Sequence, residues 1–259
     1  MSFRCCVLAS GSGGNAALVW TDSTRILVDA GLSLRELHKR LQLIGQDLER
    51  VDVICLSHSH SDHVLGVPVL ARNRAVRAQF CATPGTVEAL NGALIDANVH
   101  QFAAGESFEI GDITVQSFPV MHDAVEPCAF TFTAGGTKIG IAIDLGSITD
   151  EVVRQIDGVD LLALEANHDS DMLAVCGYPL VVKRRVAAST GHLSNAKVAA
   201  YLEANLKAQT KRIVLCHLSS ENNHPRLAAL TAAAACKRAG HHPDVVIAEQ
   251  GRPTEVFEL

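Results

Sequence analysis

Short apolar runs alternate with polar turns along the chain, and the spacing within the runs changes between a strand period and a helix period. Residues 3–8, 16–20 and 25–28 are almost continuously apolar and are separated by turn-forming residues, which is typical of buried strands. Apolar residues then recur at helical spacing from 34 to 44, directly after Ser33, which is suited to cap a helix. The first part of the chain therefore predicts three strands and a helix.

The same alternation continues to the C-terminus. Pro84 is suited to open a helix, which we expect to run to about Ala97. The other predicted strands, two of them broken by glycine turns, cover residues 51–56, 76–83, 108–120, 128–143, 161–164, 213–216 and 245–258. The other predicted helices cover residues 150–156, 195–207 and 225–239. Strands followed by a helix, repeated twice, predict an α/β fold.

Composition restricts the number of domains and the class of protein. The 259 residues are 48% hydrophobic and contain no linker, charge block or repeat, so we expect a single domain over residues 1–259. The eight cysteines lack paired spacing, which argues against a disulfide framework and favours a reduced, cytoplasmic location. The apolar stretch after Arg4 is too short for a signal peptide, and no segment approaches a membrane span. We therefore expect no membrane partner, and the oligomeric state stays open.

The most informative polar segment follows the predicted strand at residues 51–56. Three imidazoles and one carboxylate, His58, His60, Asp62 and His63, occupy six positions there. Imidazole and carboxylate are ligands of divalent ions such as zinc, manganese and iron. In a loop, this spacing lets the first two residues face one centre and the last two another. A chance run of surface histidines is the alternative, and the position at a strand end disfavours it.

The H-x-H-x-D-H string behind a strand resembles the metallo-β-lactamase superfamily. The fold of that family is a four-layer αββα sandwich of helix, sheet, sheet and helix, with metals at one edge. The family has further markers in a fixed order, each at the end of an apolar run. In this sequence the markers match Asp29, the histidine string, His122, Asp144 and His217. The resemblance therefore implies this α/β sandwich for the whole chain.

The resemblance also implies a ligand set for two divalent ions, manganese or zinc, with iron as a further candidate. One ion would be held by His58, His60 and His122, the other by Asp62, His63 and His217, with Asp144 between them. Asp29 would support the metal loop without binding. Two such ions lower the pKa of a bridging water toward neutrality, so that hydroxide can act as the nucleophile. Without the family order, His217 and Asp144 would be interpreted as an ordinary core histidine and a turn residue.

Further polar strings are similar to those of the YycJ/WalJ-type exonucleases, bacterial relatives of the tRNA 3′-end-processing hydrolase. They lie at residues 10–15, 165–169, 178–179, 191–195 and 217–223. The resemblance implies that His192, together with Asp62, is catalytic and protonates the leaving oxygen or contacts the phosphate. The residues expected to bind substrate are Ser219, Ser220, Asn222, Asn223, Asn167 and His168. Glu165 and His168 would orient the ligands; an ordinary polar loop is the alternative for the serine and asparagine string.

Charge weakens the case for a nucleic-acid substrate without removing it. A net charge of −6 gives no overall basic footprint, although basic residues cluster at positions 72–77, 183–185 and 211–212. Two metal ions would add positive charge where a phosphate must bind. The leading interpretation is a dinuclear metal-dependent phosphodiesterase that acts as a DNA exonuclease through a metal-bridging hydroxide.

Two alternatives remain at the level of sequence. The first is a hydrolase of the same fold that cleaves a small phosphodiester or a thioester, which the acidic charge favours. The second is a non-hydrolytic protein, either a redox di-iron domain or a metal-stabilised regulatory partner. His60 argues against the redox version, which usually has Glu at that place, and Asp62 argues against a closed structural site.

Overall fold

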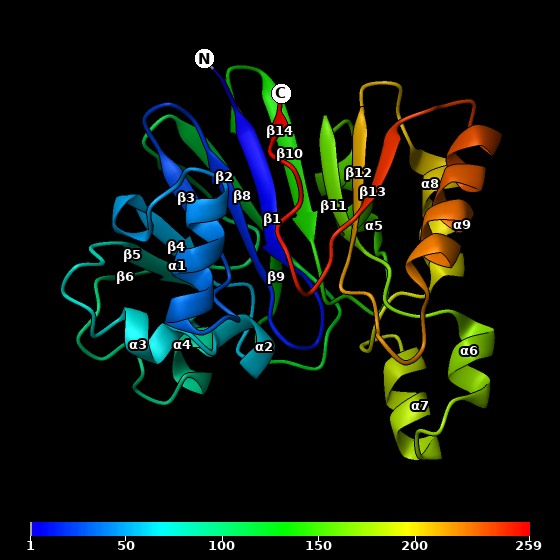
Figure 1. Cartoon of the computed structure of the whole chain (residues 1–259), viewed down its shortest axis with the longest axis horizontal. Coiled ribbons are helices and arrows are strands. Elements are labelled where there is room, and N and C mark those ends of the chain that lie inside the picture. The colour runs from blue at the N-terminus through cyan, green and yellow to red at the C-terminus, as the bar shows by residue number, and fades with distance from the viewer. Residues whose placement is uncertain (1) are drawn as a thin grey trace.

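Two seven-stranded β-sheets face each other in the computed structural model, which describes residues 2–259, and helices cover the outer side of each sheet (Figure 1). The first sheet has the strand order β14-β1-β2-β3-β4-β5-β6. Its strands are β1 Arg4–Ala9, β2 Ala16–Trp20, β3 Arg25–Val28, β4 Val53–Cys55, β5 Gln79–Ala82, β6 Val99–Gln101 and β14 Phe257–Glu258. The helices of this half are α1 Leu34–Leu43, the 3-10 helix η1 Leu48–Arg50, α2 Ser61–Val64, α3 Val67–Leu70 and α4 Pro84–Ala89.

The second sheet has the order β13-β12-β11-β10-β9-β8-β7. Its strands are β7 Ser107–Ile110, β8 Ile113–Pro119, β9 Cys128–Ala134, β10 Thr137–Ala142, β11 Leu161–Glu165, β12 Arg212–Cys216 and β13 Asp244–Ile247. The helices of this half are α5 Asp150–Ile156, α6 Ser170–Val175, α7 Leu180–Ala187, α8 Asn195–Asn205 and α9 Pro225–Arg238. Strands β10 to β13 are parallel, so the carboxyl ends of β10, β11 and β12 meet at one edge of the sheet.

The continuous apolar runs arise because the central strands are buried on both faces. In β1, Cys5 and Val7 belong to the core between the sheets, whereas Cys6 and Leu8 pack toward the helices outside. Helices α5, α8 and α9 cover the outer face of the second sheet in the same way. This arrangement confirms the predicted four-layer αββα sandwich.

Local deviations from the predicted elements have identifiable causes. Helix α4 ends at Ala89 instead of Ala97, because Asn91 and Gly92 both have positive φ angles. The predicted last strand, residues 245–258, is split into β13 and β14 by a segment that contains Pro253. Helices α6 and α7 were not predicted, since their apolar residues are largely exposed and leave no buried stripe.

All eight cysteines are free, and seven of them are buried. They act as small apolar core residues, as expected for a chain without a disulfide framework. Within residues 2–259, none of the helices combines the length and apolar character needed to cross a membrane.

Candidate metal centre

Three residues at strand ends share an uncommon backbone conformation. Asp29 follows β3, Asp144 lies just beyond β10, and His217 follows β12; their φ angles are 58°, 59° and 54°. Positive φ is rare outside glycine and often occurs at functional sites. Each turn redirects a polar side chain from a strand end into the edge between the sheets. The fold therefore collects segments that are far apart in the sequence at one place.

The histidine string begins in a loop and ends in a helical turn. His58 and His60 follow β4, while Asp62 and His63 lie in the first turn of α2. The expectation that the whole string forms a loop is wrong for its second half, where the His63 amide donates to the His60 carbonyl at 2.9 Å. The Asp62 carbonyl passes so close to Gly31 that a Cβ there would lie 1.6 Å from the oxygen, so this position requires glycine.

The predicted ligands lie together in overlapping groups. Within each group, one donor atom per residue lies within 4.8 Å of the others. The groups are His58, His60 and His122; Asp62, His63, Asp144 and His217; and Asp144, Glu165, His192 and His217. Asp144 Oδ2 lies 2.7 Å from His63 Nε2 and 3.4 Å from His58 Nε2, so this carboxylate of the second group also contacts a member of the first.

Buried atoms without partners test whether the residues fit a metal ion. Among the described residues, His58 Nε2 and His217 Nε2 are buried without a hydrogen-bond partner, and each has a carboxylate oxygen, of Asp144 and of Asp62 respectively, 3.4 Å away. The other ring nitrogen of His58 contacts Ser57 Oγ at 3.0 Å, which leaves Nε2 for a ligand. Unpaired buried polar atoms are costly, and a coordinated cation removes that cost. The nitrogen and oxygen donors of these groups fit a divalent metal ion.

The buried imidazoles and carboxylates of the cluster shift one another's pKa values in opposite directions. Burial by itself lowers the pKa of the His63 imidazole, but the carboxylates of Asp29 and Asp144 on its two sides raise it to about 10. For Asp144, burial acts to raise the pKa, and the imidazoles of His217 and His63 hold it well below its usual value. Burial lowers the pKa of His58 well below its usual range. Buried carboxylates need positive charge, which histidine protons or a bound cation can supply.

A second layer of hydrogen bonds holds the metal loop. The Asp29 carboxylate accepts from the Ser57 amide and hydroxyl, both at 2.8 Å, and contacts His63 Nδ1 at 2.7 Å. Asn15 Nδ2 lies 3.2 Å from Asp62 Oδ2 and 3.0 Å from His63 Nε2. Asp29 thus takes the supporting position expected for it, whereas Asn15 was missed. The polar string at residues 10–15 was the available signal, because it is one of the strings on which the resemblance to the exonucleases rests.

His192 joins the cluster through a buried glutamate. Its Nδ1 lies 2.7 Å from Glu165 Oε1, which also contacts His217 Nδ1 at 3.0 Å. The other carboxylate oxygen of Glu165 accepts from the amides of Leu145 and Leu193, at 3.1 and 3.0 Å, so the glutamate is fixed. Burial lowers the pKa of His192, and the Glu165 carboxylate outweighs this and raises it to about 10. The glutamate therefore fixes the orientation of both imidazoles.

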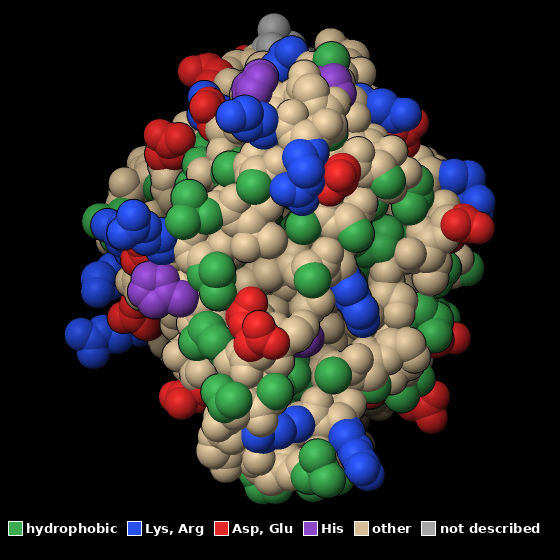
Figure 2. All heavy atoms as spheres, turned by 90° about the vertical axis from the view of Figure 1, so that its right-hand side faces the viewer, with side chains coloured by type: hydrophobic (Ala, Val, Ile, Leu, Met, Phe, Trp, Pro, Cys, Tyr) green, Lys and Arg blue, Asp and Glu red, His purple; other side chains and the backbone are tan. Residues whose placement is uncertain are grey.

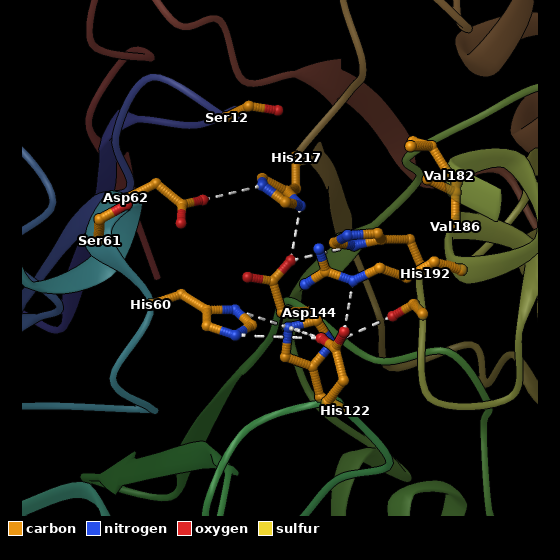
Figure 3. A pocket seen from close by; sticks show the side chains of 13 residues that line it. Ser12, His60, Ser61, Asp62, His122, Asp144, Val182, Val186, His192 and His217 are labelled. Carbon is orange, nitrogen blue, oxygen red and sulfur yellow. Dashed lines mark hydrogen bonds and ion pairs between the residues drawn. The ribbon is translucent and has the colours of Figure 1, made fainter. Parts of the chain in front are cut away.

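The clusters open into a cavity of about 350 Å³. Figure 3 shows Asp144 with His60 and His122 below it and Asp62 and His217 above it. The lining residues are Ser12, His60, Ser61, Asp62, His122, Asp123, Asp144, Val182, Arg185, Val186, Gly191, His192 and His217. Arg185 Nε donates to Asp123 Oδ2 at 2.6 Å across the rim. The sequence pattern did not indicate this pair, because its two members are far apart in the chain.

The residues expected to bind substrate are placed differently from the predicted ligands. Asn167, His168, Asn222 and Asn223 are all 5% exposed or less. Asn167 Nδ2 donates to the His217 carbonyl at 2.8 Å, which supports the backbone of that ligand. All four side chains are therefore buried, and Asn167 and Asn223 bond to neighbouring backbone carbonyls, so their binding of substrate stays a prediction.

The serines of the same string lie next to a second hollow of about 310 Å³. Ser219 and Ser220 line it together with Ser10, while Ser12 of the same loop lines the metal cavity. The structure therefore does not bring these serines into the metal cavity itself. The Ser219 hydroxyl accepts from the Asn222 amide at 3.1 Å and helps to close the turn.

Asn223 allows a test of whether these buried asparagines stabilise the fold or bind substrate. Its Nδ2 donates to the carbonyls of Ala166 and Asn167, at 2.8 and 3.2 Å, and its Oδ1 accepts from Asn195 Nδ2 at 2.9 Å. We expect Asn223→Ala to lower the free energy of unfolding by about 2 kcal/mol, because buried partners lose their bonds. Urea denaturation measures this, with exposed Ser220→Ala as the control. Unchanged stability with a raised KM on DNA would instead support substrate binding.

Comparisons with known proteins agree with this geometry. A sequence profile of the β-lactamase superfamily domain matches residues 24–218. The chain is 36% identical over 236 residues to the exodeoxyribonuclease WalJ of Streptococcus pneumoniae, covering 89% of this chain and 87% of that protein. It is 35% identical over 232 residues to the exodeoxyribonuclease YycJ of Bacillus anthracis, covering 89% and 88%.

A solved structure shows the same fold. The metallo-β-lactamase fold protein YhfI of Bacillus subtilis superimposes with a TM-score of 0.75 at 17% identity, and the match covers 100% of both chains. The profile, the curated relatives and the fold agree with one another, and the buried histidine and aspartate groups are able to bind metal. The chain therefore belongs to the metallo-β-lactamase superfamily and is a metal-dependent hydrolase.

Proposed function

We propose that this protein is a dinuclear metal-dependent phosphodiesterase that acts as a DNA exonuclease. One observation carries the proposal: two groups of ligands, joined by Asp144, open into the same cavity as the Glu165–His192 pair. The names of the two curated relatives support DNA as the substrate. Both sheets contribute ligands, so the proposal treats residues 1–259 as one domain.

In this proposal His58, His60 and His122 would hold one ion, Asp62, His63 and His217 would hold the other, and Asp144 would serve both. When bound, two divalent ions neutralise phosphate charge and activate water at neutral pH. The oxygen and nitrogen donors suit manganese or zinc. Asp29 and Asn15 keep Asp62 and His63 in place through the hydrogen bonds described above.

His192 is the proposed proton donor to the leaving oxygen. Its Nδ1 is fixed on Glu165, so Nε2 is the ring nitrogen that can serve a substrate in the cavity. The side chain is 23% exposed, whereas Glu165 is fully buried, which lets the imidazole meet a ligand while the glutamate only orients it. A proton held at this position assists cleavage most when the leaving group is a poor one, such as a sugar hydroxyl.

An assay of the purified protein tests the function. End-labelled single-stranded and duplex DNA, matched RNA and bis-p-nitrophenyl phosphate are incubated with manganese or zinc. We expect nucleotides to be released progressively from a DNA end, and a chelator to stop the reaction. Intact DNA and RNA, together with rapid turnover of a thioester or a small phosphodiester, would contradict the proposal.

Metal content is a separate prediction. We expect two ions per fully loaded chain, and we expect Asp144→Ala to release at least one, because Asp144 contacts ligands of both groups. Metal analysis by mass spectrometry measures this after equilibration with manganese or zinc. Asp96→Asn, which changes an exposed carboxylate outside the cavity, is the control. One ion or none in the loaded parent protein would contradict the dinuclear site.

One observation favours the alternative of a small-molecule hydrolase. A cavity of about 350 Å³ is at the small end of the range for sites that enclose a small ligand. Such a hydrolase would use the same metal groups and would not need contacts outside the cavity. The substrate panel above separates the two functions.

A further inference from the structure

Helices α6 and α7, residues 170–187, form an arm that projects from the body at the lower right of Figure 1. The arm contributes little to the core: Leu173 is the buried residue of α6, and α7 has none among its described residues. Lys183 Nζ donates to the Ala174 carbonyl at 2.6 Å and ties the two helices together. Since core packing does not explain the arm, its surfaces are available for another role.

Large apolar side chains are exposed where the two helices join. Val175 is 85% exposed, Val181 73% and Leu180 61%. Single exposed apolar residues are ordinary, but a group of this size on one small element marks a binding surface. A helix whose apolar residues face water needs a partner for that surface.

The arm is also basic in an acidic protein. Residues 170–187 contain three basic residues, Lys183, Arg184 and Arg185, and one acidic residue, Asp171, although the net charge of the chain is −6. Figure 2 shows basic and hydrophobic side chains next to each other at the bottom of this face, where α6 and α7 lie. This combination suits a partner with both negative charge and apolar faces.

The arm borders the metal cavity. Val182, Arg185 and Val186 of α7 line the cavity together with His192. The His192 amide donates to the Val186 carbonyl at 2.9 Å, so the arm and the catalytic loop are joined. A cavity of about 350 Å³ can hold the end of a strand, and the rest of the strand must then lie on the surface beside it. The arm provides part of that surface.

This inference rests on the proposed exonuclease function. We infer that the α6–α7 arm binds the DNA strand next to the cleavage site. Arg184 contacts a backbone phosphate beside Arg185, whose Nε is paired with Asp123, while Val175, Leu180 and Val181 pack against the faces of unpaired bases. Single-strand binding generally combines a basic surface with aromatic side chains on which bases stack, and here exposed aliphatic side chains would take their place. The three basic residues of α7 outnumber the single aspartate of α6, which favours a nucleic acid as the partner.

The inference is tested with Arg184→Glu and Val181→Asp, two changes of exposed residues. We expect the ratio of kcat/KM on single-stranded DNA to that on bis-p-nitrophenyl phosphate to fall about tenfold in each. For Arg184→Glu, the slope of log Kd for DNA against log salt should fall by about one. The matched controls on α9 are Lys237→Glu and Leu230→Asp, which change exposed residues in the same way and should keep the parent ratio.

The outcomes separate this inference from the proposed function. If the parent degrades DNA and both arm variants keep its ratio, the arm inference is wrong and the exonuclease proposal stands. A parent that cleaves no DNA overturns both. If light scattering shows that Val181→Asp dissociates a dimer without weakening DNA binding, the arm is an interface between copies and the inference fails. If the introduced charges destabilise the arm, as measured by the melting temperature, the test is repeated with Arg184→Ala and Val181→Ser.

Discussion

Replacing Asp62 with asparagine should lower turnover of DNA by about a thousandfold while leaving the protein folded. Asp62 Oδ2 lies 3.4 Å from His217 Nε2 and 3.6 Å from His63 Nε2, and its side chain is 20% exposed toward the cavity. The amide keeps the shape of the carboxylate but removes its negative charge, so it weakens both metal binding and the orientation of the attacking water. The fold should survive, because the Asp62 carbonyl still accepts from the Asn15 amide at 2.7 Å.

The measurement is kcat on end-labelled DNA, with metal content and melting temperature determined on the same sample. Asp96→Asn makes the same chemical change at an exposed site and should behave like the parent protein. An Asp62→Asn variant that is fully active with normal metal content would contradict the proposed mechanism. A large loss of melting temperature would show instead that the aspartate is needed for folding.

Replacing His192 with alanine should reduce turnover of DNA by about a hundredfold, the usual contribution of a positioned general acid. The loss should be much smaller on bis-p-nitrophenyl phosphate, because p-nitrophenolate leaves without needing a proton. Metal content should stay close to that of the parent, since Glu165 still contacts His217 at 3.0 Å. The measurement is the ratio of kcat on DNA to kcat on bis-p-nitrophenyl phosphate, determined on one preparation each of the variant and the parent.

His38→Ala is a suitable control, because His38 lies on the surface of α1 and outside the cavity. Equal losses on both substrates would mean that His192 maintains the site rather than donating a proton. No loss on DNA would remove His192 from the mechanism altogether. Neither result bears on the proposed metal ions, which are tested by metal analysis and by the Asp62→Asn variant.

The apolar pattern predicted many of the strands and helices for a physical reason, whereas the four layers were implied by the family resemblance. Strands β2 and β3 and helix α5 begin and end where the apolar pattern placed them. The central strands are buried on both faces, so their composition alone marks them, and turn residues mark their ends. The position directly after a buried strand singled out the string from His58 to His63, whereas His122, Asp144 and His217 were identified through the order of the superfamily markers.

The sequence could not show which polar residues point into the cavity. Asn15 and Asp62 are 47 residues apart, and Glu165 and His192 are 27 residues apart, so their contacts exist only once the sheets have assembled. The string at residues 217–223 looked like a substrate loop, yet Asn222 and Asn223 are buried. A polar side chain has the same sequence signature whether it bonds to the backbone or to a ligand.

The sequence by itself determined the chemistry available to this protein: nitrogen and oxygen donors at strand ends, in an order typical of one superfamily. Only the tertiary structure decided the geometry. It placed Asp144 between two groups of ligands, fixed His192 on Glu165 and set the exposed α6–α7 arm beside the cavity. Local patterns fix elements because burial and backbone hydrogen bonding act over a few residues, whereas a site depends on contacts between segments that only the packed sheets bring together.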